Sequence, residues 1–174
     1  MEIYLIRHTT PDIAKEICYG QSDIGLVGSF PEESQRILQE LPASVDKVFT
    51  SPLKRCVQLA QLISGSGLEQ IWQLQEMDFG DWELKPWSDI PRAELDPWMA
   101  DFVNHQVPKG ESMRLLADRV LGWFQNLKSL GLEKVAIVTH AGPMRIILSE
   151  VNQTPLEEAF ERYQVSYGEV IHIG

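Results

Sequence analysis

The chain opens with a short apolar run that leads directly into an arginine and a histidine. Residues 3–6 read Ile-Tyr-Leu-Ile and are followed by Arg7, His8 and Thr9. A short run of β-branched and aromatic residues is typical of a buried strand in a parallel sheet. Open α/β folds bind their ligands at the carboxyl edge of such a sheet. This segment therefore predicts a central strand that presents Arg7 and His8 at a ligand-binding edge.

A second apolar run also ends in a histidine. Residues 135–139 lead into His140, and Pro143 is suited to the first turn of the helix that follows. Parallel strands of one sheet present their carboxyl ends at the same edge. We therefore expect His8 and His140 to lie close together.

A third segment brings an arginine to the same edge. Residues 48–50 form a short strand, Ser51-Pro52 is a typical helix start, and Arg55 falls in the first turn of that helix. The free N–H groups and positive end of a helix favour an anion. Arginine fits phosphate through its planar fork, and histidine can act as a nucleophile toward phosphorus. The three strand ends together predict a phosphate site.

The hydrophobic pattern along the chain predicts strands that alternate with helices. Such alternation is typical of an α/β fold with a mostly parallel sheet. We expect a single-domain, three-layer sandwich over residues 1–174, with helices flanking the sheet and a turn at 65–67. The expected strands are 2–7, 47–50, 70–74, 134–140 and 169–173, and the expected helices are 31–41, 52–63, 112–130 and 143–151.

Residues 78–109 interrupt this alternation. Prolines recur through the stretch, and five large aromatic side chains lie between them. It is too aromatic for a disordered linker and too broken for one long helix. We predict an insertion of short helices that covers the sheet edge and the active site. Most of its aromatic residues should pack the insertion against the body, and one or two should line a pocket.

Composition narrows the class of protein further. The formal net charge of −10 opposes binding to nucleic acid or to anionic membranes. No apolar run approaches the roughly 20 residues that span a bilayer, and no secretion signal is visible. Cys18 and Cys56 provide no disulfide framework and lack metal-ligand spacing. These features predict a cytoplasmic protein that uses neither a metal nor another cofactor.

Four stretches of the chain occur in a recognisable order: LIRHT at 5–9, TSPLKR at 50–55, QEMDFGDWE at 75–83 and VTHAG at 138–142. Together they resemble the histidine phosphatase superfamily, which has the phosphoglycerate-mutase-like fold. Within that superfamily, Thr9 and the stretch ICYGQSD at 17–23 are most similar to the α-ribazole-5′-phosphate phosphatases of cobalamin assembly. The family commonly has a glycine where Leu84 follows a Trp-Glu pair here.

This resemblance implies a histidine acid-type phosphatase that acts through a phosphohistidine without a metal. It assigns His8 as the nucleophile, Arg7, Arg55 and His140 as phosphate-binding residues, and Glu76 as the acid. We expect a nearby backbone carbonyl to fix the tautomer of the His8 ring. Acidic residues of the pocket should favour the protonated form of His140.

The choice of acid rests on the resemblance, because several carboxylates share one short window. Asp78, Asp81 and Glu83 lie close to Glu76 in the sequence, and surface acid clusters are usually solvated. Matching to the family selects Glu76, which follows the third predicted strand. Glu83 is the alternative.

The substrate implied by the resemblance is a small phosphorylated metabolite, α-ribazole 5′-phosphate. Thr9, Tyr19 and Trp82 are the candidate pocket residues. We expect Trp82 to stack on the flat base of the substrate, as aromatic rings do on nucleobases. The alternatives are a phosphatase of other small phosphorylated metabolites and a protein that binds phosphorylated ligands without catalysis.

Overall fold

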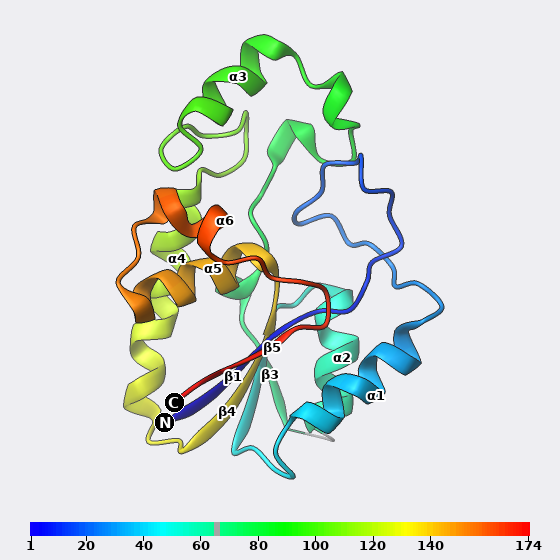
Figure 1. The fold of residues 1–174 in the computed structure, drawn as a ribbon, viewed down its shortest axis with the longest axis vertical. Coiled ribbons are helices and arrows are strands. Elements are labelled where there is room, and N and C mark those ends of the chain that lie inside the picture. The colour runs from blue at the N-terminus through cyan, green and yellow to red at the C-terminus, as the bar shows by residue number, and fades with distance from the viewer. Residues whose placement is uncertain (65–66) are drawn as a thin grey trace.

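The computed structural model describes residues 1–64 and 67–174 as an α/β sandwich built on one five-stranded sheet (Figure 1). The strand order is β3-β2-β4-β1-β5. The single-domain fold with a mostly parallel sheet is therefore confirmed. The turn predicted at 65–67 falls largely on residues outside the described part of the chain.

The first strand occupies the interior of the sheet, as its apolar run predicts. It is parallel to β4 on one side and antiparallel to β5 on the other, and β2 is parallel to both β4 and β3. The carboxyl ends of β1, β2, β3 and β4 thus share one edge. The bounds are β1 Glu2–Arg7, β2 Lys47–Thr50, β3 Leu68–Gln70, β4 Lys134–Thr139 and β5 Val170–Ile173.

Helices cover both faces of this sheet. Alternate strand residues point to opposite faces, so Leu5 and Ile137 belong to one core and Ile6 and Val138 to the other. The larger core packs against α4 and α5, and the smaller core against α1 and α2. The bounds are α1 Phe30–Glu40, α2 Lys54–Ser64, α4 Met113–Leu127 and α5 Ala141–Asn152.

The helix ends follow the chemistry of their capping residues. Ser112 caps α4 by accepting a hydrogen bond from the Leu115 amide at 3.3 Å. Gly131 ends the following turn η4 (Lys128–Leu130) with a left-handed φ of 68°. Helix α5 starts at Ala141, two residues before Pro143, with His140 as its N-cap residue. His140 therefore lies both at the end of strand β4 and at the start of helix α5.

The third strand differs from its prediction at 70–74. Its pairing with β2 ends at Gln70, because β2 itself ends at Thr50 and offers no further partner. The chain then turns into η1 (Trp72–Leu74), where the Leu74 amide donates to the Ile71 carbonyl at 3.0 Å. This turn buries Ile71 and Leu74 and leaves Trp72 exposed.

Residues 78–109 lie beyond the carboxyl edge of the sheet, at the top of Figure 1. They contain η2 (Gly80–Trp82), η3 (Trp87–Asp89) and α3 (Arg92–Ala100), as a segment of short helices should. The turn η5 (Leu156–Glu158) and helix α6 (Ala159–Arg162) follow α5 near the same edge. Among the described residues, no helix is long and apolar enough to cross a membrane.

Candidate active site

The two predicted histidines meet at the carboxyl edge of the sheet. Arg7 pairs with Thr139 in the parallel register of β1 and β4, and the His8 amide donates to the Thr139 carbonyl at 3.0 Å. The rings of His8 and His140 stand edge to face, with their centroids 5.0 Å apart. Backbone pairing between adjacent strands therefore sets the spacing of the two imidazoles.

His8 is held as a neutral imidazole with a defined tautomer. Its Nδ1 lies 2.7 Å from the Thr9 carbonyl oxygen, which can only accept, so Nδ1 carries the proton. Burial, and then the cations of Arg55 and Arg7, hold the pKa of His8 well below its usual value. Nε2 consequently keeps a free lone pair. The expected backbone carbonyl is that of Thr9, whose own side chain is buried and outside the cavity lining.

The expected protonation of His140 is wrong for this structure. His140 is fully buried, and its Nε2 lies 2.8 Å from Ser51 Oγ. Burial is the largest cause that lowers its pKa well below the usual value, followed by the charge of Arg55. Burial, and then the nearby cations, therefore favour the neutral form of His140. It packs against His8 and does not itself line the cavity.

Arg55 is buried at the start of α2, where the Ser51-Pro52 signal places it. Its Nη1 donates to the Ser22 carbonyl at 2.8 Å, and its Nη2 to the Gly20 carbonyl at 2.5 Å. Its Nε has no hydrogen-bond partner among the described residues. Arg55 lines the cavity beside His8, so this guanidinium both supports the loop and faces the cavity.

Glu83, the alternative acid, supports that same loop. Its carboxylate accepts hydrogen bonds from the amides of Gly20, Gln21 and Ser22 at 2.9–3.2 Å, and from the Ser22 hydroxyl at 2.5 Å. A further bond from the Phe79 amide measures 3.2 Å. Glu83 does not line the cavity. These bonds make Glu83 a structural residue that shapes the loop held by Arg55.

Arg7 lies on the other side of the cavity floor. Its Nη1 donates to the Val165 carbonyl at 2.6 Å, and its guanidinium stacks 3.8 Å from the ring centroid of Tyr167. The hydroxyls of Tyr167 and Tyr19 are 2.6 Å apart. Arg7, the predicted phosphate-binding residue, lines the cavity. Tyr19, a predicted pocket residue, lines it as well.

Glu76 reaches into the cavity from the segment that follows η1. Its Oε1 accepts from the Met77 amide at 3.0 Å and from the Gly142 amide at 3.1 Å. Gly142 lies in the first turn of α5, so the carboxylate faces the positive end of that helix. A Cβ on Gly142 would overlap Glu76 Oε1. The absence of a side chain at position 142 is what admits the carboxylate.

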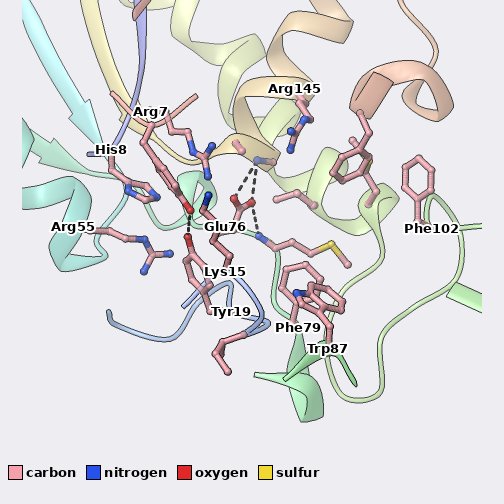
Figure 2. A pocket seen from close by; sticks show the side chains of 18 of the residues that line it. Arg7, His8, Lys15, Tyr19, Arg55, Glu76, Phe79, Trp87, Phe102 and Arg145 are labelled. Carbon is pink, nitrogen blue, oxygen red and sulfur yellow. Dashed lines mark hydrogen bonds between the residues drawn. The ribbon is translucent and has the colours of Figure 1, made fainter. Parts of the chain in front are cut away.

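A cavity of about 240 Å³ joins these residues. Figure 2 shows His8 and Arg55 toward one end, Phe79, Trp87 and Phe102 toward the other, and Glu76 between them. One end therefore carries a cation and a histidine, and the other is aromatic. This division suits a phosphate ester with an apolar or flat leaving group.

The expected position of Trp82 in the cavity wall is wrong. Trp82 is 1% exposed, and its indole N–H donates to Glu94 Oε2 at 2.9 Å beneath the wall. Trp87 and Trp98 line the cavity instead, stacked with their ring centroids 6.3 Å apart. An aromatic-rich window in the sequence does not reveal which ring faces inward, because its short turns have no regular period.

Two cations of the cavity were not predicted from the sequence. Arg145 of α5 stacks on Phe160, and its Nε donates to the Tyr163 carbonyl at 3.1 Å. Lys15 contributes from a loop. A signal for Arg145 exists, since residues three apart share a helix face and Arg145 lies three after Gly142. Lys15 has no comparable signal.

Over residues 1–64 and 67–174, no three His, Cys, Asp or Glu side chains gather in a way that could hold a metal ion. The charges at the cavity floor come from Arg7 and Arg55. A paired-histidine site with two arginines at the edge of a parallel sheet defines an α/β protein that handles phosphate esters.

Comparison with known proteins places this site in a family. The model of the histidine phosphatase superfamily, branch 1, matches residues 3–174. The chain belongs to this superfamily, and this membership supports a phosphatase activity.

Individual relatives agree with this placement. The chain is 28% identical to a Hydrogenobacter thermophilus protein with the provisional name phosphoserine phosphatase 2, over 95% of this chain and 86% of that protein. It is 26% identical to the adenosylcobalamin/α-ribazole phosphatase of Escherichia coli, over 97% and 87%. The fold also matches an α-ribazole phosphatase from Shigella flexneri, with a TM-score of 0.91 at 24% identity, covering 100% and 90% of the two chains.

Proposed function

We propose that this chain is a metal-independent phosphomonoesterase whose His8 carries the phosphoryl group. The observation that carries the proposal is the hydrogen bond from His8 Nδ1 to the Thr9 carbonyl, at 2.7 Å. It leaves the Nε2 lone pair free in a ring that lines the cavity between Arg7 and Arg55. A neutral, oriented imidazole between two guanidinium groups suits attack on a phosphate.

The proposed reaction has two steps. In the first, His8 Nε2 forms a bond to phosphorus while the phosphorus–oxygen bond to the leaving group breaks, and Glu76 gives that oxygen its proton. In the second, water attacks phosphorus, the nitrogen–phosphorus bond breaks, and Glu76 takes up the proton. Arg7 and Arg55 neutralise the phosphoryl oxygens in both steps. The sum is hydrolysis of a phosphate ester to an alcohol and inorganic phosphate.

Bound phosphate should also change the state of His140. An anion close to the two histidines opposes the effect of the arginines and favours the imidazolium form. His140 would then carry a positive charge beside His8 only when substrate is present. This behaviour is consistent with the lowered pKa of His140 in the structure.

The favoured substrate within this proposal is α-ribazole 5′-phosphate. The stacked rings of Trp87 and Trp98 offer a surface for a flat base, and such stacking contributes roughly 1–3 kcal/mol per base in nucleic-acid proteins. The E. coli relative is named for the same substrate. A ribose between the phosphate and the base would extend from the cationic end to the aromatic end.

Arg145 favours a second candidate, a small phosphorylated acid. Its half-buried guanidinium forms no salt bridge among the described residues. Burial lowers its pKa, and the negative charge of Glu76 opposes that effect. A carboxylate on the leaving group would pair with Arg145. The H. thermophilus relative carries the name of a phosphoserine phosphatase, and phosphoserine has such a group.

A substrate panel tests the proposal. The panel contains para-nitrophenyl phosphate, α-ribazole 5′-phosphate, phosphoserine and phosphoethanolamine, each assayed with a chelator present. We expect turnover to survive chelation and to vanish in His8→Ala, while His105→Ala, at an exposed histidine, retains it. Acid-labile phosphate trapped during turnover should map to His8. Phosphate binding without turnover would indicate a non-catalytic binder, and a requirement for a divalent ion would refute the mechanism.

A further inference from the structure

The segment that carries Glu76 has no strand neighbour to hold it. Strand β3 ends at Gln70, and beyond the turn η1 the chain runs free of the sheet to Asp78. Its carbonyl groups still require donors, because a buried backbone carbonyl without a partner is destabilising. The position of the Glu76 carboxylate depends on what supplies those donors.

Arg119 of helix α4 supplies them. Its Nη1 donates to the carbonyls of Gln73 at 2.6 Å and Gln75 at 2.9 Å, and its Nη2 donates to the Glu76 carbonyl at 2.8 Å. One guanidinium therefore holds three carbonyls within four residues, the last of them on Glu76 itself. Only a planar group with several fixed donors can satisfy this arrangement.

Glu111 completes the clamp from the other side. Its two carboxylate oxygens accept from Arg119 Nε at 2.7 Å and from Arg119 Nη2 at 2.8 Å. Its Oε2 also accepts from the Asp78 amide at 3.0 Å, and its own amide donates to the Asp78 carbonyl at 2.8 Å. The pair therefore grips the chain on both sides of Glu76.

This ion pair is sheltered from solvent. The side chains of Arg119 and Glu111 are 9% and 18% exposed. Hydrogen bonds of charged groups are stronger in such surroundings than at the surface, and removing one partner leaves the others unsatisfied. Neither residue lines the cavity, so neither touches a substrate.

We infer that Arg119, oriented by Glu111, is a positioning residue that holds Glu76 where it can transfer a proton to the leaving group. This inference rests on the proposed role of Glu76 as the acid. The geometry ties the two together. The Glu76 carbonyl accepts from Arg119 at 2.8 Å and from Gln21 Nε2 at 3.1 Å, and the Glu76 side chain accepts from the amides of Met77 and Gly142.

The inference has a kinetic signature that lost stability alone cannot produce. A poor leaving group, such as an alkyl alkoxide, needs a proton as its bond to phosphorus breaks. The para-nitrophenolate ion is a good leaving group and needs little help. A displaced acid should therefore slow alkyl phosphates far more than para-nitrophenyl phosphate.

The test compares kcat/KM for glycerol phosphate and para-nitrophenyl phosphate in Arg119→Lys, which keeps the charge but loses the fork. This ratio reports the steps up to departure of the leaving group and excludes the later hydrolysis step that the two substrates share. We expect at least a ~10-fold loss on glycerol phosphate and less than about a threefold loss on para-nitrophenyl phosphate, since general acids contribute 10²–10⁴-fold. Arg114→Lys is the matched control, because Arg114 lies on the same helix and its exposed side chain bonds, within the described part of the chain, only Asn104. It should leave both rates unchanged.

Equal losses on the two substrates, or no loss on either, would overturn the inference. If Arg119→Lys does not fold, Glu111→Gln provides the same comparison. It should also lose more activity on glycerol phosphate than on para-nitrophenyl phosphate, but to a smaller degree. Glu76→Gln separates the two proposals. If Glu76→Gln loses more activity on glycerol phosphate than on para-nitrophenyl phosphate but Arg119→Lys does not, only the positioning role is refuted. If Glu76→Gln loses activity equally on the two substrates, the proposed role of the acid is refuted.

Discussion

The Gly142 amide of helix α5 donates to the carboxylate of the proposed acid, Glu76, at 3.1 Å. Alanine at position 142 would overlap Glu76 Oε1 and press on a methyl group of Leu116. We predict that Gly142→Ala lowers kcat for alkyl phosphates at least ~10-fold, because the carboxylate must leave its place. The intrinsic preference of alanine over glycine in a helix, about 1 kcal/mol, offsets part of the packing cost.

Gly122 of helix α4 provides the control for this prediction. A Cβ there would meet nothing within 4 Å. Gly122→Ala should leave kcat unchanged and raise the free energy of unfolding by up to about 1 kcal/mol. Urea unfolding and steady-state kinetics on both variants provide the comparison. Full activity in Gly142→Ala would contradict the assigned role of the glycine.

Arg145 should govern the response to charge on the leaving group. We predict that Arg145→Met lowers kcat/KM for phosphoserine about tenfold or more relative to phosphoethanolamine, which lacks the carboxylate, because hydrogen bonds between charged groups contribute ~1.5–3 kcal/mol. The rate with para-nitrophenyl phosphate should change little. An unchanged ratio between the two amine substrates would count against a second anion subsite.

The residues at strand ends could be read from the sequence because backbone geometry places them. His8 and His140 each follow a buried apolar run, and the parallel register brings them together. Trp82 and Arg145 depend on side-chain packing between distant segments instead. The protonation of His140 was predicted wrongly for the same reason, since it depends on burial and on cations that other elements bring close.

At the scale of elements, the short helices of 78–109 contain two kinds of tryptophan: one that lines the cavity and one that packs the segment against the body. Trp98 lines the cavity, whereas Trp82 lies beneath its wall. We predict that Trp98→Ala reduces the preference for α-ribazole 5′-phosphate over glycerol phosphate by about tenfold to a hundredfold, the loss expected for one stacked ring. Trp82→Phe should lower the melting temperature and leave that preference intact. Measuring both quantities on both variants tests the assignment, and a preference lost only in Trp82→Phe would reverse it.

The regular elements followed the sequence closely, and the exceptions have tertiary causes. Helices start and end within two residues of their predicted bounds where a cap, a proline or a glycine marks the end, apart from the last turn of the 112–130 helix, which continues as η4. Strand β3 is shorter than predicted because its partner β2 ends first. Leu84 adopts a left-handed φ of 63°, a conformation that favours glycine, and the family commonly has glycine at this position.

The molecule as a whole should lose stability on mild acidification. Burial holds the pKa values of His8 and His140 below the usual value. Below about pH 6.5, these histidines therefore bind protons in the unfolded chain but stay neutral in the folded chain. Their contribution is complete above about pH 6.5 and is lost as the pH falls below it. We predict that the free energy of unfolding falls by about 1.4 kcal/mol per pH unit for each histidine that stays neutral.

Urea unfolding between pH 7.5 and 5 measures this dependence. The window lies above the range where the carboxylates with lowered pKa values, Glu33 and Asp46, take up protons. His8→Asn should remove about half of the slope, because one of the two buried imidazoles is gone. His105→Asn, at an exposed position, should leave the slope unchanged. A flat profile in the unmodified protein would show that the buried rings accept protons without cost.

Because the spacing of His8 and His140 comes from hydrogen bonds between adjacent strands, it does not depend on the loops above them. Mutations that accumulate in 78–109 can therefore alter which ester is accepted and leave the two histidines in place. Proteins with this fold can therefore evolve new substrate preferences through mutations in this segment, without passing through an inactive intermediate. Exchanging that segment between two relatives would reproduce such a step in one experiment.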